Sequence, residues 1–242
     1  NLKTLQMLNA GYDDALAYLR PGLTLCNARG VHDASTAELA VGLAISSRRG
    51  FPEFMREQIA GNWSHHRTAA LSDSKIGIIG FGSIGKKIAQ NLSGFEVSIT
   101  AFTQSGRDGS LTIDQLDSHL PQLDIVILIL PLSDSSRHLF NAERLSKMKD
   151  GALLINVARG PVVDTEALLR ELNSKRIFAA LDVTDPEPLP AGHPLWSAPN
   201  LQIVPHVGGN SDAFEPRGRA LIESQLELLA AGAPLEHVVA QS

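Results

Sequence analysis

The sequence predicts an α/β fold built around a doubly wound parallel sheet, and three observations carry that prediction. Short apolar runs alternate with amphipathic stretches from about residue 75 to residue 205. The runs are apolar throughout, as in strands that are buried on both faces. A glycine-rich turn, from Gly80 to Gly85, directly follows the first run and opens the first amphipathic stretch. Strands joined by helices in this order form a parallel sheet covered on both sides.

Each apolar run is expected to form a strand, and the amphipathic stretches between them are expected to form helices. The expected strands are Lys75 to Gly80, Val97 to Phe102, Asp124 to Leu130, Ala152 to Asn156, Ile177 to Asp182 and Leu201 to Val204. The expected helices are Ile84 to Leu92, Asn141 to Met148 and Asp164 to Leu172.

The turn after the first strand has the Gly-x-Gly-x-x-Gly spacing of dinucleotide-binding sites, in the run Gly80-Phe81-Gly82-Ser83-Ile84-Gly85. The first glycine allows a tight turn, the second lets the backbone approach a pyrophosphate, and the third lets the helix pack closely on the strand. The helix N-terminus then offers unpaired N–H groups to the phosphates. We therefore predict a dinucleotide site at Gly80, Gly82, Ser83, Ile84 and Gly85.

The tip of the second strand bears on the choice between NAD and NADP. An acidic residue that binds the ribose hydroxyls is expected there in an NAD site, but the stretch reads Ala-Phe-Thr-Gln-Ser-Gly-Arg from residue 101 to residue 107. Thr103 and Ser105 offer hydroxyl groups, and Arg107 can pair with a 2′-phosphate. We expect NADP(H) to be preferred, with NAD(H) as the alternative.

Two further helices flank the α/β unit. Ala34 to Arg49 is expected to be helical, with Ser35 or Thr36 as N-cap and Gly50 ending it. Pro216 to Ala231 is the second. We predict a dinucleotide-binding domain at residues 34–209 and a partial second domain from residues 1–33 and 210–242. Because the chain opens with Asn1 rather than Met, we expect that the beginning of this second domain is missing.

The composition excludes several classes of partner. The net charge of −5 and the pI near 5.9 predict no bulk attraction to nucleic acid or to anionic lipid. No apolar run is long enough to span a bilayer. The single cysteine, Cys26, cannot form an internal disulfide, which favours a reducing cytoplasm. His65 and His66 are a lone pair without further ligands, so we expect no metal site.

Three reactive side chains follow predicted strands: Arg159, Glu187 and His206. The carboxyl ends of parallel strands line one crevice, so these side chains are expected to converge. Arg159 can bind a substrate carboxylate through its planar fork. His206 can donate a proton to a developing oxyanion, and Glu187 can orient the imidazole and favour its charged form. This set suits the reduction of a 2-keto acid.

The motifs together resemble one family. The runs DIVILILPLSDSSRHLFN, MKDGALLINVARGPVVDTEAL, LDVTDPEPLP, HPLWSAPN and VPHVGG, with the glycine turn, closely resemble the D-isomer-specific 2-hydroxyacid dehydrogenases over roughly residues 1 to 235. The resemblance implies a Rossmann domain, a flavodoxin-like substrate domain, and activity as a glyoxylate or hydroxypyruvate reductase. It also implies a homodimer, because in related enzymes the helix that corresponds to Ala34 to Arg49, and the arm after it, pack against a second subunit.

The resemblance also implies roles for individual residues. The family's catalytic Arg, Glu and His fall on Arg159, Glu187 and His206, and its carboxylate-binding loop falls on Asn9, Ala10 and Gly11. Asp182 would hold the nicotinamide carboxamide. Other residues expected beside the cofactor are Pro131, Ser136 and Gly208, and His193 falls in a motif of structural character.

Departures from the family pattern leave alternatives open. The family usually has an acid where Thr103 stands, and its NADP-using reductases also lack that acid. A dinucleotide-sensing, corepressor-like protein is a second hypothesis, although the chain ends soon after its last helix. A phosphoglycerate dehydrogenase is a third, although no C-terminal regulatory domain follows. Formate enzymes place a Gln before the catalytic His, where this chain has Pro205.

Overall fold

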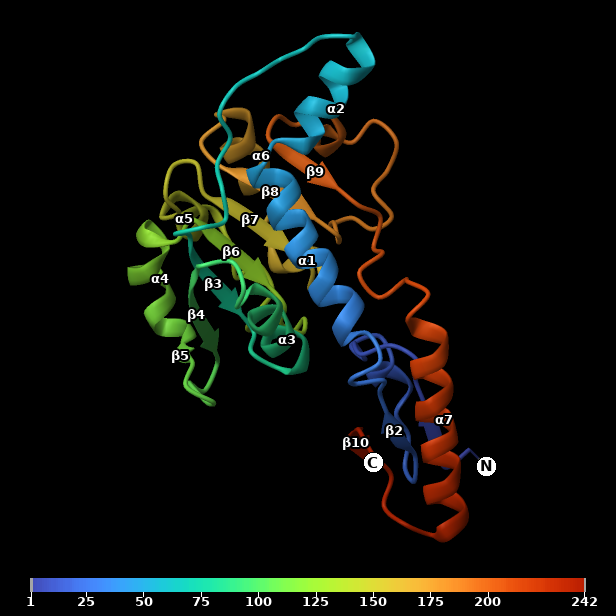
Figure 1. Cartoon of the computed structure of the whole chain (residues 1–242). Helices are drawn as coiled ribbons and strands as arrows, with labels where there is room; N and C mark the ends of the chain where they lie inside the picture. The colour runs from blue at the N-terminus through green and yellow to red at the C-terminus, as the bar shows by residue number, and fades with distance from the viewer. Residues whose placement is uncertain (1, 242) are drawn as a thin grey trace.

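The computed structural model describes residues 2–241 and arranges them around two sheets (Figure 1). The larger sheet has seven strands in the order β5-β4-β3-β6-β7-β8-β9, and all its pairings are parallel. The smaller sheet has the order β1-β2-β10, with β1 parallel and β10 antiparallel to β2. The predicted α/β class and doubly wound parallel sheet are confirmed.

The elements have the following bounds. The strands are β1 (Thr4–Gln6), β2 (Thr24–Cys26), β3 (Lys75–Ile79), β4 (Ser98–Thr103), β5 (Leu111–Thr112), β6 (Ile125–Leu128), β7 (Leu153–Asn156), β8 (Phe178–Leu181), β9 (Leu201–Ile203) and β10 (Val238–Gln241). The α-helices are α1 (Asp33–Arg48), α2 (Phe51–Ala60), α3 (Ser83–Leu92), α4 (Leu116–His119), α5 (Ala142–Ser146), α6 (Thr165–Asn173) and α7 (Phe214–Ala231). The 3-10 helices are Leu16–Tyr18, Ile113–Gln115, Leu120–Gln122, Gly160–Val162 and Pro194–Ser197.

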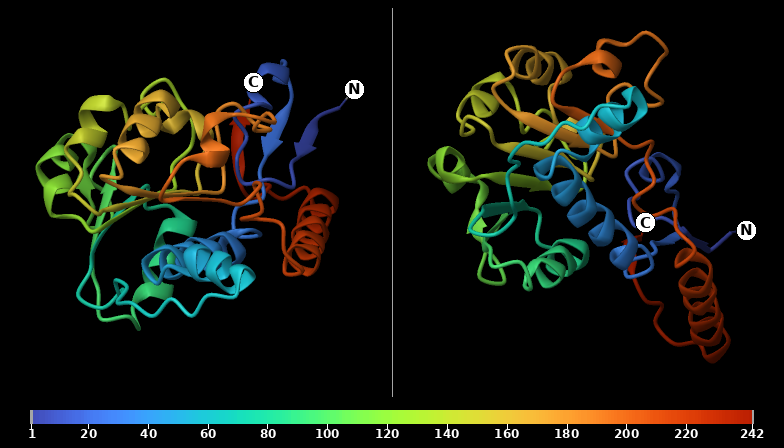
Figure 2. Two further views of the ribbon diagram at one scale, coloured as in Figure 1. Left: turned by 90° about the horizontal axis from the view of Figure 1, so that it is seen from above. Right: turned by 45° about the horizontal axis from the view of Figure 1, so that its top comes forward.

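Helices cover both faces of the larger sheet, as the view from above shows (Figure 2). On one face, Leu120, Leu145 and Leu168 bring α4, its neighbouring turn, α5 and α6 into one buried cluster. On the other face, Ala40 of α1 and Ile88 of α3 join the second cluster. Burial on both faces explains why the central strands are apolar throughout.

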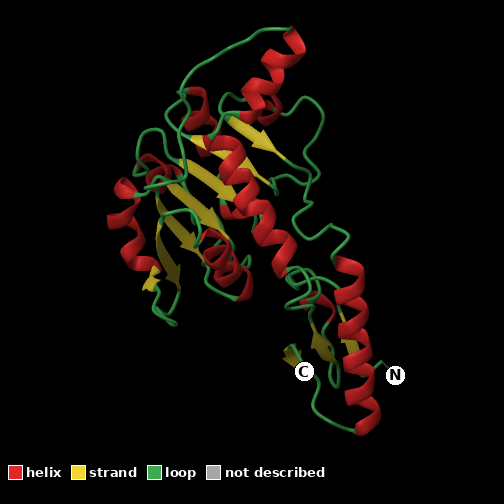
Figure 3. Ribbon diagram, in the orientation of Figure 1, coloured by secondary structure: helices red, strands yellow, loops and turns green. Residues whose placement is uncertain are grey.

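The strand order reverses at β3, which lies between β4 and β6. In a doubly wound sheet, ligands bind at such a switch point, beyond the carboxyl ends of the strands. The arrowheads of these strands point toward the smaller sheet and α7 (Figure 1). The loops that follow the strands are drawn green in Figure 3, and they carry the candidate functional residues.

The smaller sheet packs with α7 around a buried amide. Gln225 on α7 is 4% exposed; its Nε2 donates to Gln6 Oε1 at 2.7 Å and to the Glu236 carbonyl at 2.8 Å. These hydrogen bonds join α7, β1 and the segment that leads into β10. The predicted boundaries of the two domains, at residues 34 and 209, stay a prediction.

One expectation about the first long helix needs correction. Its N-cap is His32, without a side-chain capping bond, rather than Ser35 or Thr36. Ser35 lies inside the first turn and its hydroxyl pairs with Ser211 instead. Gly50 ends this helix as predicted, since it follows the C-cap Arg49 with a φ of 68°, and α2 begins directly after it. No helix among residues 2–241 is long and apolar enough to cross a bilayer.

Candidate functional site

The glycine turn after β3 has the geometry that a dinucleotide requires. Gly80 has a φ of 101°, and a β-carbon there would overlap the carbonyl oxygen of Ile129. A β-carbon on Gly85 would overlap the carbonyl of Gly80. A β-carbon on Gly82 would meet nothing within 4 Å. The first and third glycines are therefore required by packing inside the protein, whereas the second leaves open space for a ligand.

The N-terminus of α3 is open to the same space. Its N-cap, Gly82, provides no side-chain hydrogen bond. Ser83 is exposed, and Ile84 is half-buried against the second core cluster. The first amides of a helix lack partners within the helix, so this end of α3 can hold phosphate oxygens. Residues 80–85 thus fit the pyrophosphate of a dinucleotide.

The loop after β4 places its polar groups unequally. Thr103 is 8% exposed, and its hydroxyl pairs with that of Ser110 at 2.7 Å, so it shapes the loop from inside. Ser105 and Arg107 are exposed. Lys86 of α3 reaches the loop and pairs with Asp108 at 2.8 Å. This hydrogen bond and the charges of Lys86 and Arg107 hold the pKa of Asp108 below its usual value.

The loop after β6 is organised by Ser136, which is 4% exposed. Its hydroxyl donates to the carbonyl of Pro131 at 2.8 Å and accepts from the amide of Ser133 at 2.7 Å. Pro131 itself is exposed at the switch point. Ser136 therefore positions Pro131, and its predicted contact with a ribose stays a prediction.

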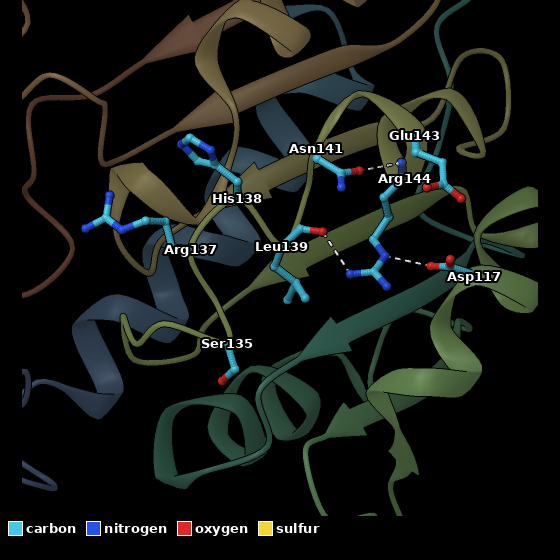
Figure 4. Close-up of a pocket in the computed structure, with 8 residues that line it drawn as sticks. All are labelled: Asp117, Ser135, Arg137, His138, Leu139, Asn141, Glu143 and Arg144. Carbon is cyan, nitrogen blue, oxygen red and sulfur yellow. Dashed lines mark hydrogen bonds and ion pairs between the residues drawn. The ribbon is translucent and has the colours of Figure 1, made fainter.

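A cavity of about 220 Å³ lies beside this loop (Figure 4). Arg144 points toward Asp117 and pairs with it at 2.6 Å, and it also donates to the carbonyl of Leu139 at 2.8 Å. Arg137 and His138 point away from that pair. The charged groups at its centre are satisfied by each other, so the cavity itself indicates no ligand.

Arg159 follows β7, and its side chain lies against the loop at residues 9–13, between β1 and β2 of the smaller sheet. Buried Asn156 shapes its turn by accepting from the amide of Ala158 at 3.0 Å and donating to the carbonyl of Arg159 at 3.0 Å. The guanidinium packs on the α-carbon of Gly11, where a β-carbon would overlap Nη2. Its Nε lies 3.3 Å from Oδ2 of Asp13. The structure thus brings Arg159 to the predicted carboxylate-binding loop.

That loop is anchored from the end of β2. The buried Asn27 donates to the carbonyl of Ala10 at 2.7 Å, and the amide of Ala28 donates to the carbonyl of Asn9 at 3.0 Å. Among the described residues, no acceptor is paired with the amides of Ala10 and Gly11. The carbonyl oxygens of Asn9 and Ala10 are thus satisfied, while the N–H groups of Ala10 and Gly11 stay available to an anion.

His206 and Glu187 form a hydrogen-bonded pair. Nδ1 of His206 lies 2.5 Å from Oε1 of Glu187, and both side chains are accessible, at 49% and 39%. His206 has a φ of 51°, a backbone conformation that costs a non-glycine residue roughly 1–2 kcal/mol. Its amide donates to the carbonyl of Asp182 at 2.7 Å, which holds that conformation. Nε2 of His206 has no hydrogen-bond partner among the described residues.

Asp182 lies behind this pair and is 4% exposed. Its carboxylate accepts from the amides of Val207 at 2.7 Å and Gly208 at 3.0 Å. Burial raises the pKa of Asp182, although both amides and the charge of His206 oppose that rise. A β-carbon on Gly208 would lie 2.7 Å from Oδ2 of Asp182. Gly208 therefore permits the contact that positions the histidine loop.

Sequence reasoning missed several residues that shape the site. Asn156 could have been found, because Asn at a strand end often turns the backbone through its side chain. Asp13 and Asn27 carry no local signal, since their partners lie at distant positions in the chain. Gly160 was also missed; a β-carbon there would overlap the carbonyl of Thr184, so this glycine lets the loops after β7 and β8 touch.

These features allow one chemistry at the carboxyl ends of the strands: Arg159, after β7, can hold an anion, and the imidazole of His206, after β9, can exchange a proton. His193 lies apart, capping the turn Pro194–Ser197 by accepting from the amide of Leu195 at 3.2 Å. His66 lies near Glu53 and Phe54 on the arm that contains α2.

Comparison with known proteins gives the family. The family model described as D-isomer specific 2-hydroxyacid dehydrogenase, NAD binding domain, matches residues 41–208. A glyoxylate reductase of Thermofilum pendens is 37% identical over 234 residues, which cover 90% of this chain and 68% of that protein.

Solved structures agree. A D-isomer specific 2-hydroxyacid dehydrogenase from Xanthobacter autotrophicus Py2, in complex with NADPH and MES, matches with a TM-score of 0.86 at 31% identity, over 99% of this chain and 79% of its own. An NAD-dependent formate dehydrogenase from Staphylococcus aureus, in complex with NAD, matches with a TM-score of 0.86 at 28% identity, over 100% and 77%. The chain therefore belongs to the D-isomer specific 2-hydroxyacid dehydrogenases and carries the NAD-binding domain of these oxidoreductases.

Proposed function

We propose that this protein reduces a small 2-keto acid, such as glyoxylate or hydroxypyruvate, to the 2-hydroxy acid with NADPH as the hydride donor. The observation that carries the proposal is the pairing of His206 Nδ1 with Glu187 at 2.5 Å, at the same sheet edge as Arg159. A proton donor beside a carboxylate-binding arginine is what reduction of a 2-keto acid requires. The glyoxylate reductase of Thermofilum pendens supports this substrate class.

The residues divide the work as follows. Arg159 binds the substrate carboxylate through Nη2, while its Nη1 donates to the carbonyl of Ala158, and the free amides of Ala10 and Gly11 add hydrogen bonds to the carboxylate. This fixes the keto carbon for attack. When bound, the nicotinamide cofactor supplies the hydride that adds to this carbon. His206 donates the proton from Nε2 to the carbonyl oxygen, and Glu187 stabilises the charged imidazole before transfer. One hydride and one proton convert the keto group to the hydroxyl group.

The cofactor site is assigned from the same loops. Residues 80–85 hold the pyrophosphate, Pro131 and Ser136 line the ribose side, and Asp182 with Gly208 lies at the nicotinamide end. The preference for NADPH rests on the loop after β4. Thr103 stands at the strand tip where an acid would bind the ribose hydroxyls, and the exposed Ser105 and Arg107 offer a hydroxyl and a cation to a 2′-phosphate.

The test is a spectrophotometric assay of NADPH and NADH oxidation with glyoxylate, hydroxypyruvate and pyruvate. We expect turnover with NADPH and a kcat/KM at least tenfold higher than with NADH. His206→Asn, which keeps the fold and removes the proton donor, is the matched control and should lose turnover but not NADPH binding. Tight cofactor binding without turnover of any keto acid would favour the dinucleotide-sensing alternative.

The protein is also proposed to be a homodimer. The arm formed by α2 and the segment after it exposes an apolar row, with Met55 63%, Ile59 86% and Trp63 96% exposed. Such a row indicates an interface. Sedimentation velocity should show a dimer for the wild type and a monomer for Ile59→Glu. Gln58→Glu, which adds the same charge at a neighbouring polar position, should stay dimeric.

A further inference from the structure

His32 lies where the part of the chain built on the smaller sheet meets the part built on the larger sheet. It precedes α1, and its ring lies between two loops that come from different units. Nε2 is 2.7 Å from the carbonyl oxygen of Leu8, and Nδ1 is 3.1 Å from the carbonyl oxygen of Gly209. Leu8 immediately precedes the carboxylate-binding loop at residues 9–11. Gly209 lies three residues after His206.

The two acceptors determine which form of the ring fits. A carbonyl oxygen can only accept a hydrogen bond, and a neutral imidazole has a single N–H group. Only the imidazolium can donate to Leu8 and to Gly209 together. We propose that His32 is a positioning residue whose protonated form ties the carboxylate-binding loop to the loop of the proton donor, so that acidification strengthens the site.

The surroundings hold the ring between these loops. It stacks on Phe214 of α7, with centroids 5.3 Å apart and planes 7° apart. A β-carbon on Gly209 would lie 2.6 Å from Nδ1, so this glycine lets its loop approach the ring. One turn further along α1, Ser35 pairs with Ser211 at 2.6 Å. His32 and Ser35 thus both connect α1 to the same short loop, and of the two only His32 also reaches Leu8, through its second ring nitrogen.

Most of the charged groups on the neighbouring elements have other partners. Asp33 accepts from the amide of Gly30 at 3.3 Å, and Glu215 pairs with Arg219 at 3.4 Å. Within residues 2–241, none of the groups on the elements around the ring forms an ion pair with His32; these groups are Arg29, Asp33, Asp182, His206, Asp212, Glu215 and Arg217. The two carbonyl groups are therefore the direct partners that distinguish the charged ring from the neutral one.

When the imidazolium of His32 loses one of its two ring protons, it also loses one of its two hydrogen bonds. The shorter bond, to Leu8, is expected to remain, and the bond to Gly209 is expected to break. The loop that carries His206, the proposed proton donor, is then no longer held at a fixed distance from the bound carboxylate. Because small misplacements of reacting groups slow catalysis strongly, we expect kcat/KM to fall about tenfold beyond the loss caused by His206 alone. This expectation about catalysis rests on the proposed function; the two-sided hydrogen bonding does not.

The first experiment needs no turnover. Nuclear magnetic resonance of the protein with 15N-labelled histidine follows both ring nitrogens of His32 between pH 5 and pH 8, with the signal assigned from His32→Gln. We expect the amide signals of residues 9–11 and 208–210 to shift together with the titration of His32 in the wild type and to lose that dependence in His32→Gln. A ring that stays neutral throughout, or loop signals that ignore it, would overturn the proposal.

The second experiment measures kcat/KM for keto-acid reduction against pH. The wild-type slope should be steeper than −1 on the alkaline side, reaching up to about −1.5 where His32 loses its proton because the effect of His32 is only about tenfold, whereas His32→Gln and His32→Ala should stay at about −1. Ser35→Ala, which removes only the neighbouring tie, and His119→Gln, a remote histidine on α4, should keep the wild-type slope. If turnover is normal but all profiles coincide, the role of His32 is refuted and the proposed function stands. If no keto acid is reduced, the proposed function fails and the resonance experiment still decides the role of His32.

Discussion

The guanidinium of Arg159 packs directly on the α-carbon of Gly11, so closely that a β-carbon on Gly11 would overlap Nη2. The two residues come from different sheet units, and their contact is where the proposed carboxylate site is assembled. The ion pair of Arg159 with Asp13, at 3.3 Å, holds the Nε side of the same group. Nη1 donates to the carbonyl of Ala158 at 2.8 Å, so among the described residues Nη2 is the nitrogen that has no acceptor.

Gly11→Ala should therefore damage substrate binding selectively. The added methyl group displaces the guanidinium, and we expect KM for the keto acid to rise and kcat/KM to fall by about ten- to a hundredfold, the range of a lost charge-assisted hydrogen bond. Steady-state kinetics and NADPH titration by fluorescence measure the two effects separately. Gly94→Ala, at a glycine with open space around it, should behave as wild type. A normal KM in Gly11→Ala would remove this loop from the carboxylate site.

The glycine turn allows a matched pair of substitutions. In Gly80→Ala the methyl group meets the Ile129 backbone at a positive φ, so we expect a loss of stability of several kcal/mol. In Gly82→Ala the methyl group meets only open space, so the melting temperature should be nearly unchanged while NADPH affinity falls tenfold or more. Thermal unfolding and cofactor titration of both variants check this contrast. Equal NADPH affinity in Gly82→Ala and the wild type would move the pyrophosphate away from this turn.

Glu187→Gln tests the orienting carboxylate. Gln keeps the shape of Glu187 but removes the charge that stabilises imidazolium at His206. Loss of a hydrogen bond between charged groups costs about 1.5–3 kcal/mol, so kcat should fall by about ten- to a hundredfold. His206→Asn should lose about a hundredfold or more, the range for general acid catalysis. An unchanged kcat in Glu187→Gln would leave His206 without an orienting partner.

Arg107→Ala should change the choice of cofactor. Removing the exposed cation weakens pairing with a 2′-phosphate, and we expect KM for NADPH to rise about tenfold with little change for NADH. The ratio of kcat/KM values for the two cofactors is the measurement. Arg137→Ala removes an exposed cation near the cavity beside α5 and serves as the control. A constant ratio in Arg107→Ala would assign the preference to other groups.

Asp124 should contribute to stability in a pH-dependent way. Burial alone would raise the pKa of Asp124, but hydrogen bonds from Lys149 Nζ at 2.6 Å and from the Lys75 amide at 2.9 Å outweigh burial and hold this pKa below its usual value. A carboxyl group whose pKa is lower in the folded state stabilises the fold above its unfolded pKa, about 3.9, and loses that effect as the pH falls through the folded pKa.

Asp124→Asn should therefore lower the free energy of unfolding at pH 7 by about 1–3 kcal/mol, and the difference from wild type should shrink toward pH 3. Urea unfolding at several pH values measures it. Asp150→Asn, at a side chain that is 87% exposed and pairs with Arg176 at 3.3 Å, should have little effect at either pH. A difference that does not depend on pH would mean that Asp124 acts through packing alone.

The sequence by itself determined the parallel sheet and the positions of the reactive side chains. Apolar runs predicted six of the seven strands of the larger sheet, namely β3, β4, β6, β7, β8 and β9. A strand that is buried on both faces needs apolar residues at successive positions, so each of these segments can be recognised by itself. The same topology brings residues after different strands to one edge, and so Arg159, Glu187 and His206 could be named in advance.

Only the tertiary structure decided how the two units meet. The partners of Asp13, Asn27 and His32 lie up to 177 positions away in the chain, and no periodicity of a single segment records such pairings. Two further features could not be predicted from a local pattern either: β10 pairs antiparallel to β2, and α1 has no side-chain cap. Hydrophobic patterning specifies which face of an element is buried, whereas polar contacts between loops depend on where distant elements have been packed.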